Sequence, residues 1–276
     1  MIVLNESEWA KKMIDERSLG KRAFDTLIRV ARYYMEVEGA SKKEARMLLD
    51  EFVAECDSSI SLVKWSHTLD RAVRTAAKFR SVNIDKITVT ESEMDVINGL
   101  KGRQIQKLLF TLLCVAKYWM AVNPELNGWV STPPNEIMKM ANLNVSADRR
   151  SRLLGYLKDA GLIAFPASYD NTNIRVTFVD DSSPAALEIT DFRNLGNQFM
   201  MYCGENYIVC ERCGLVVKER CHGKGAHQRF CPDCAIGGAI QSKVNRVMRP
   251  DLAEDPDAEV VEVKVNFSLK NVEITV

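Results

Sequence analysis

The sequence predicts a mainly α-helical protein with small β parts, an α+β fold. Three observations carry this prediction. Apolar residues recur every three or four positions over about the first 80 residues and again from about 105 to 160, as in amphipathic helices. Short segments of alternating apolar and polar residues follow at 162–178 and near the C-terminus, which indicates strands. Two Cys-x2-Cys pairs stand between those segments, at residues 210–213 and 231–234.

Composition limits the possible locations and partners of the chain. The 276 residues include 37 basic and 37 acidic side chains, so any nucleic-acid surface must be a local patch. Charge appears as early as Glu6, and we therefore expect no secretory signal. No run of about 18 apolar residues occurs, so we expect no membrane span. The eight cysteines then suggest a reducing, cytoplasmic location, and the oligomeric state stays open.

Residues 1–83 are expected to form an N-terminal helical bundle. One apolar face runs from Phe24 to Met35, and a second helix starts at Ser41, where Glu44 completes a capping box. A third helix is expected from about Val63 to Phe79, with both of these residues on its apolar face. Three amphipathic helices of this length can enclose a small core.

Residues 84–180 are expected to form a second domain. Ile84 to Val89 alternates as a strand, and Thr90 with Glu93 forms another capping box at the start of a helix. The long apolar segment 105–122 predicts a core helix. A short helix at 134–141, a turn, a second helix at 147–160 and a strand pair at 162–165 and 174–178 complete the domain.

This order resembles the winged helix-turn-helix family, and the resemblance implies that the helix at 147–160 enters the DNA major groove. That helix carries Arg149, Arg150 and Arg152, and Arg149, Arg152 and Tyr156 share one outward face. Arg175 lies on the second strand of the expected wing. Winged helices also serve as docking modules, so a protein-binding role stays open.

The four cysteines have the spacing of a structural zinc site, with 17 residues between the two pairs. We expect Cys210, Cys213, Cys231 and Cys234 to hold one structural Zn²⁺. A β-hairpin is expected between the pairs, with strands at 215–217 and 228–230. This stretch resembles the zinc-ribbon family over about residues 206–236. Redox-active or disulfide-bonded thiols are alternatives, and Cys221 or His222 could replace a ligand.

The remaining segments flank the ribbon. Residues 181–205 are expected to be a connector, and residues 206–249 combine the ribbon with a basic helix. Residues 250–276 are expected to form an acidic linker and a C-terminal β tail, because Val, Ile and Phe alternate with polar residues from 260 onward. The basic side chains expected to contact nucleic acid in the ribbon segment are Lys218, Arg220, Lys224, Arg229, Lys243 and Arg246.

These features predict a zinc-containing nucleic-acid-binding protein. The combination resembles, in general architecture, regulatory or replication-associated DNA-binding proteins of phages and mobile elements. The alternative is a non-enzymatic adaptor or inhibitor that docks on a host nucleic-acid-processing complex. Catalysis is not expected, because His67, His222 and His227 lack carboxylates at metal or triad spacing and the predicted zinc site is full.

Overall fold

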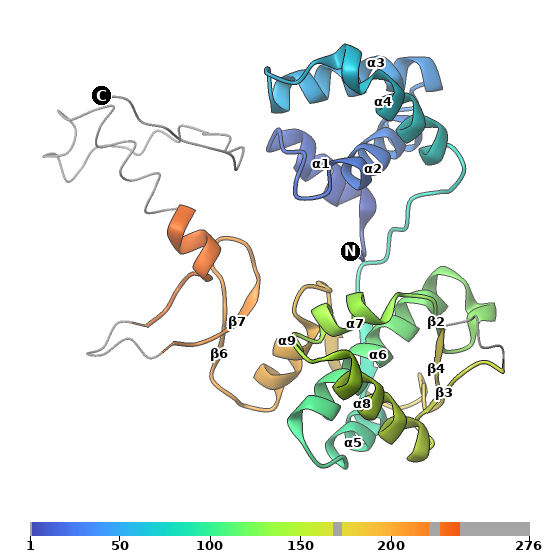
Figure 1. Ribbon diagram of the computed structural model, residues 1–276, viewed down its shortest axis with the longest axis vertical. Coiled ribbons are helices and arrows are strands. Elements are labelled where there is room, and N and C mark those ends of the chain that lie inside the picture. Colours follow the sequence, from blue (N-terminus) through green and yellow to red (C-terminus); the bar gives the residue numbers. More distant parts are fainter. Residues whose placement is uncertain (1, 168–172, 221–226, 238–276) are drawn as a thin grey trace, which may run out of the picture. The chain divides into compact units, whose positions relative to one another are not determined.

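A computed structural model of the chain describes residues 2–167, 173–220 and 227–237 (Figure 1). Two compact units are present, Asn5–Asn83 and Ile84–Ile236, and the segment that ends at Leu4 belongs to the second. Helices predominate in the described residues, with three small sheets, so the predicted α+β class is confirmed. The predicted basic helix and C-terminal β tail lie outside the described residues.

The first unit is a four-helix bundle. Its helices are α1 (Glu6–Asp15), α2 (Ala23–Glu36), α3 (Lys42–Cys56) and α4 (Leu62–Ala76). Their apolar faces enclose one core, which includes Leu27, Val30, Leu49, Phe52, Leu69 and Val73. The capping box at Ser41 is confirmed, since Glu44 N–H donates to Ser41 Oγ and the Glu44 carboxylate accepts from Ser41 N–H.

The predicted apolar face of the last helix was wrong at both ends. Val63 is 87% exposed and Phe79 is 66% exposed. Val63 lies in the first turn of α4 on the side away from the core, and the helix ends at Ala76, before Phe79 is reached. The periodic pattern therefore identified the helix but overestimated the length of its buried face.

The second unit is built around α6 (Arg103–Val122). Figure 1 shows α6 in the middle of this unit, with other helices around it. By length and composition α6 could cross a membrane, but its most apolar stretch is 72% buried inside the unit. The preceding strand β1 (Ile87–Thr90) and helix α5 (Glu91–Asn98) meet at Thr90, where the predicted capping box with Glu93 is confirmed.

Among the described residues up to 176, two α-helices and three strands follow α6, in the order β2 (Trp129–Val130), α7 (Pro134–Met140), α8 (Ala147–Asp159), β3 (Ile163–Ala164) and β4 (Ile174–Val176). The three strands form one antiparallel sheet in the order β2-β4-β3. Both helices and both hairpin strands were predicted within a few residues. Strand β2 was not, because two residues are too short to show an alternating pattern.

The segment from 181 to 205 belongs to the core of the second unit. Strand β5 (Ala185–Ile189) pairs antiparallel with β1, about 100 residues earlier in the chain. Helix α9 (Leu195–Tyr202) packs on α6, with the rings of Phe110 and Phe199 5.2 Å apart. Gly196 also lets α9 approach the end of α7, since a Cβ there would lie only 2.0 Å from the carbonyl oxygen of Ala141.

A buried ion pair joins α6 to α5 beside the β1–β5 sheet. Lys117 is 6% exposed and Glu93 is 1% exposed, and their Nζ and Oε2 atoms lie 2.9 Å apart. Lys117 Nζ also donates to the carbonyl oxygen of Thr88 and to Asp181. The other Glu93 oxygen accepts from the N–H of Asp180. These contacts fix Asp180 and Asp181, shortly before β5, against α5 and α6.

The last sheet pairs β6 (Tyr207–Val209) with β7 (Val216–Lys218). The predicted hairpin was therefore wrong in its partner. Strand β7 pairs with residues before the first cysteine pair, and residues 228–230 form no strand. The two strands flank Cys210 and Cys213, so the hairpin turn itself carries the first pair of thiols.

Candidate metal centre and basic helix face

The four predicted cysteine ligands meet at one point. The Sγ atoms of Cys210, Cys213, Cys231 and Cys234 all lie within 4.8 Å of one another. The Sγ atoms of Cys213 and Cys231 are 3.7 Å apart. A tetrahedral zinc ion with Zn–S bonds of about 2.3 Å requires sulfurs about 3.8 Å apart. The four cysteines can therefore hold a metal ion.

Backbone geometry places each pair of sulfurs. Cys210 directly follows strand β6, and the N–H of Gly214 donates to the carbonyl oxygen of Cys210 at 2.8 Å. Gly214 has φ = 72°, a left-handed conformation that glycine adopts without a Cβ clash. Cys231 precedes a helical stretch at 232–237, and the N–H of Cys234 donates to Cys231 Sγ at 3.5 Å. Both pairs thus form tight turns that point their sulfurs inward.

The thiols differ in acidity. Burial alone raises the pKa of Cys210, but hydrogen bonds from the backbone of Cys231, Cys213 and Arg212 outweigh it and lower that pKa to about 6. Burial and the neighbouring sulfurs raise the pKa values of Cys231 and Cys234. Four adjacent thiols cannot all ionise without a compensating charge, and a divalent cation supplies that charge. Cys221 and His222, the alternative ligands, lie outside the described residues.

Residues outside the cysteine cluster hold the two turns in place. Arg229 forms three hydrogen bonds with the Glu211 carboxylate, the shortest at 2.6 Å, and so links the second cysteine pair to the first. Arg193 donates to the carbonyl oxygen of Cys213 at 2.6 Å. The first contact joins the two cysteine turns to each other, and the second ties the ribbon to the rest of the unit. The sequence alone did not predict either.

Asn197 connects the ribbon to the turn between α7 and α8. This residue is buried, and its Nδ2 donates to the carbonyl oxygen of Val216 in β7 at 3.0 Å. Its Oδ1 accepts from Asn142 Nδ2 at 2.9 Å, and Asn142 lies just after α7. One amide side chain therefore joins two segments about 75 residues apart.

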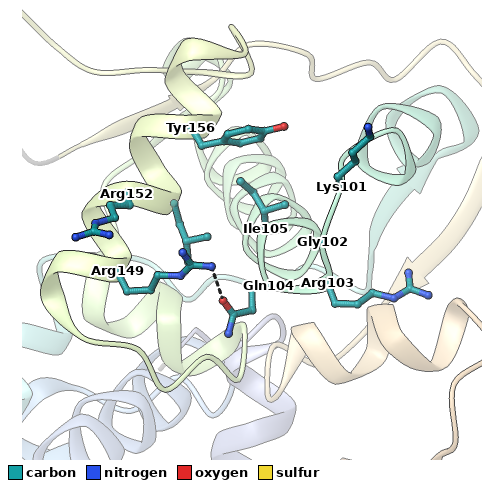
Figure 2. A pocket seen from close by; sticks show the side chains of 9 residues that line it. Lys101, Gly102, Arg103, Gln104, Ile105, Arg149, Arg152 and Tyr156 are labelled. Carbon is teal, nitrogen blue, oxygen red and sulfur yellow. Dashed lines mark hydrogen bonds between the residues drawn. The ribbon is translucent and has the colours of Figure 1, made fainter.

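Helix α8 presents its arginines to solvent. Ser146 Oγ accepts from the N–H of Arg149, as the predicted cap requires, and Leu153 and Leu157 are buried against the rest of the unit. Arg149, Arg152 and Tyr156 are exposed and line one pocket (Figure 2). Their predicted common face is therefore confirmed.

The other predicted basic residues occupy several environments. Arg150 is turned to Asn135 of α7, with which it forms a hydrogen bond. Arg175 lies on β4, the middle strand of its sheet, and its Nε donates to the carbonyl oxygen of Asn127 at 3.1 Å. Lys218 and Arg220 are exposed at the end of β7, whereas the charge of Arg229 is balanced by Glu211. Lys224, Lys243 and Arg246 lie outside the described residues.

Comparison with protein-family models, curated proteins and solved structures gave no match. The site therefore has to be interpreted from its own chemistry. In Figure 2 the pocket beside α8 is also lined by the segment from Lys101 to Ile105, which sequence reasoning did not include. The available signal was a helix start, Lys-Gly-Arg, that has two cations and no acidic residue.

Proposed function

We propose that this chain is a non-enzymatic, zinc-containing nucleic-acid-binding protein in which α8 contacts DNA. The supporting observation is the exposed cationic half of α8, the second helix of a helix-turn-helix order. A helix in this position places its N-terminal residues in the major groove in helix-turn-helix proteins. Arg149 and Arg152 lie in that half of α8 and project to solvent.

The surrounding strands support a winged helix-turn-helix reading. Helices α7 and α8 are followed by the hairpin β3–β4, and β2 completes a three-stranded sheet beside them. In this reading the hairpin is the wing, and Arg175 on β4 adds a cation beside the duplex. Arg149 and Arg152 would supply base-edge or phosphate contacts, and Arg175 phosphate contacts.

Zn²⁺ is the proposed metal, because four thiolates in a tetrahedral arrangement suit zinc and leave no coordination site for water. The ion would act as a structural cross-link between the two cysteine turns. Hydrogen bonds of Arg193 and Asn197 would then hold the ribbon against α9 and the turn before α8. A regulatory or replication-associated role at a DNA site fits this combination of a reading helix and a rigid ribbon.

The test compares two double variants that remove the same charge. Arg149→Ala with Arg152→Ala is expected to weaken binding to a random duplex pool and to reduce the slope of log affinity against log salt by about two units. Lys42→Ala with Lys43→Ala, on the exposed start of α3, should leave both quantities unchanged. Fluorescence anisotropy over a salt series measures both. No duplex binding at about 50 mM salt would refute the proposal.

Docking on another protein is the second candidate function. The ribbon segment exposes the large apolar side chains of Val209, Phe230 and Ile236, which nucleic acid would not require. A host nucleic-acid-processing complex is the proposed partner in that case. A pull-down that survives nuclease treatment, and that is lost in a Phe230→Ser, Ile236→Ser variant, would favour docking over DNA binding.

A further inference from the structure

A pocket of about 400 Å³ lies between α8 and the segment that begins α6 (Figure 2). Its volume is at the small end of the range of about 300–1,000 Å³ that ligand sites occupy. Such a hollow suits one nucleotide and is too small to enclose a duplex. One wall is formed by Lys101 to Ile105, which precede and begin α6, and the other by four residues of α8.

The floor and one wall of this pocket are apolar or aromatic. Ile105 and Leu153 are nearly buried and line it from the two helices. Tyr156 is 49% exposed and presents its ring beside Ile105 in Figure 2. An exposed tyrosine ring is a platform on which an unpaired base stacks, whereas a base inside a duplex already has both faces covered.

The rim of the pocket is cationic. Lys101, Arg103, Arg149 and Arg152 line it, and no acidic residue does. Arg103 is balanced by Glu205, and Arg152 by Asp148. In the described part of the chain Lys101 has no ion-pair partner, and the Arg149 guanidinium donates to the neutral side chain of Gln104 and not to a carboxylate. Two positive charges at the pocket are therefore not neutralised.

Backbone donors add to this positive rim. Gly102, with φ = 107°, precedes α6 without a side-chain cap. In the described residues the N–H groups of Arg103, Gln104 and Ile105 meet no acceptor of the protein. Three N–H groups without an acceptor, next to the positive charges of Lys101 and Arg149, can bind the oxygens of a phosphate group.

We propose that this pocket binds a nucleoside phosphate, with the phosphate at Lys101, Arg149 and the start of α6 and the base stacked on Tyr156. The inference rests in part on the proposed function, because α8 supplies residues both to this pocket and to the proposed DNA-binding surface. The nucleotide can come from an unpaired position in a nucleic-acid strand or from free nucleotide in solution. Gln104 is placed to position the phosphate through Arg149.

The experiment measures binding of the full-length protein to three probes: a blunt duplex, the same duplex with a short single-stranded end, and a mononucleotide. Anisotropy at about 50 mM salt is used for the duplexes and ligand-observed NMR for the mononucleotide. We expect the single-stranded end to increase affinity about tenfold, the effect of one stacked base. Tyr156→Ala should abolish this increase, and Tyr156→Phe, which keeps the ring, should retain it. Tyr202→Ala, at a similarly exposed tyrosine outside the pocket, is the matched control.

The outcomes separate this inference from the proposed function. Equal affinity for blunt and single-stranded-end duplexes, with no mononucleotide signal, would overturn the pocket and leave duplex binding standing. A mononucleotide signal that depends on Tyr156, without binding to either duplex, would support the pocket for free nucleotide and refute DNA binding. Absence of binding in all three arms would overturn both.

Discussion

Breaking the buried ion pair between Lys117 and Glu93 should destabilise the second unit strongly. In Lys117→Met the ammonium is lost, while the Glu93 carboxylate stays at 1% exposure. Two backbone N–H donors, those of Thr90 and Asp180, would then be the remaining partners of that carboxylate. Removing one member of a buried pair costs about 3–5 kcal/mol. We expect a loss of that size in the free energy of unfolding.

Urea unfolding followed by tryptophan fluorescence and circular dichroism measures this loss, with the transition of each unit fitted separately. Lys86→Met is the matched control, since Lys86, just before β1, and Glu188 of β5 form a half-exposed pair 2.6 Å apart. An exposed pair contributes about 0–1 kcal/mol. Adding Glu93→Gln to Lys117→Met should recover part of the loss, because the unpaired charge is gone. Similar losses in Lys117→Met and Lys86→Met would refute the reasoning.

Three further predictions concern the ribbon, its link to α9 and the hydrogen-bonded carboxylate of Asp180. Chelation of the metal should remove the β6–β7 signals from amide exchange spectra while the four-helix unit keeps its protection, because a structural metal site folds with its ion. Asn197→Ala should reduce stability by about 1–3 kcal/mol at unchanged metal content, since the Val216 carbonyl loses a buried donor. Hydrogen bonds from Ser182, Ser92 and Ser183 hold the pKa of Asp180 well below its usual range. Asp180→Asn should therefore destabilise the protein at neutral pH, and the difference should shrink as pH falls below about 4, where the unfolded chain binds the proton first.

Each of these has a result that contradicts it. Retention of one metal per chain in a Cys213→Ala, Cys234→Ala variant would show that other residues bind the ion. Loss of metal in Asn197→Ala would mean that Asn197 shapes the cysteine cluster itself. For Asp180, a stability difference from wild type that stays constant between neutral pH and about pH 3 would exclude the hydrogen-bonded carboxylate as its cause.

Local signals predicted much of this structure. Capping boxes at Ser41 and Thr90 marked true helix starts, and the spacing of Cys210 to Cys234 identified four sulfurs that do converge. Contacts between distant residues were not predictable in this way. Strand β5 pairs with β1, about 100 residues earlier, and the sequence of a five-residue strand does not indicate which strand it pairs with. The partner assigned to β7 was wrong although β6 is close in the sequence, because a three-residue strand does not indicate which nearby segment it pairs with.

In the candidate site, too, local features were predictable and contacts between distant segments were not. The face formed by Arg149, Arg152 and Tyr156 follows from helical spacing alone. The opposite wall of the pocket, from Lys101 to Ile105, comes from a helix that starts some 45 residues earlier. The approach of this wall to α8 depends on the packing of Ile105 and Leu153. Helical periodicity predicts that both residues are buried, but it does not predict which residues they contact.

The β1–β5 pairing decides how this protein can be divided for experiments. A fragment that ended at residue 180 would carry the helix-turn-helix segment but would leave the edge of β1 unpaired and Phe110 without the ring of Phe199. An open edge beside exposed apolar side chains favours aggregation. A fragment that started at residue 206 would lose Arg193 and Asn197, which hold the cysteine turns from outside. Truncation after residue 83 would separate the four-helix unit, at the cost of the segment ending at Leu4 that belongs to the second unit. Helix α8 and the ribbon, by contrast, have to be expressed together.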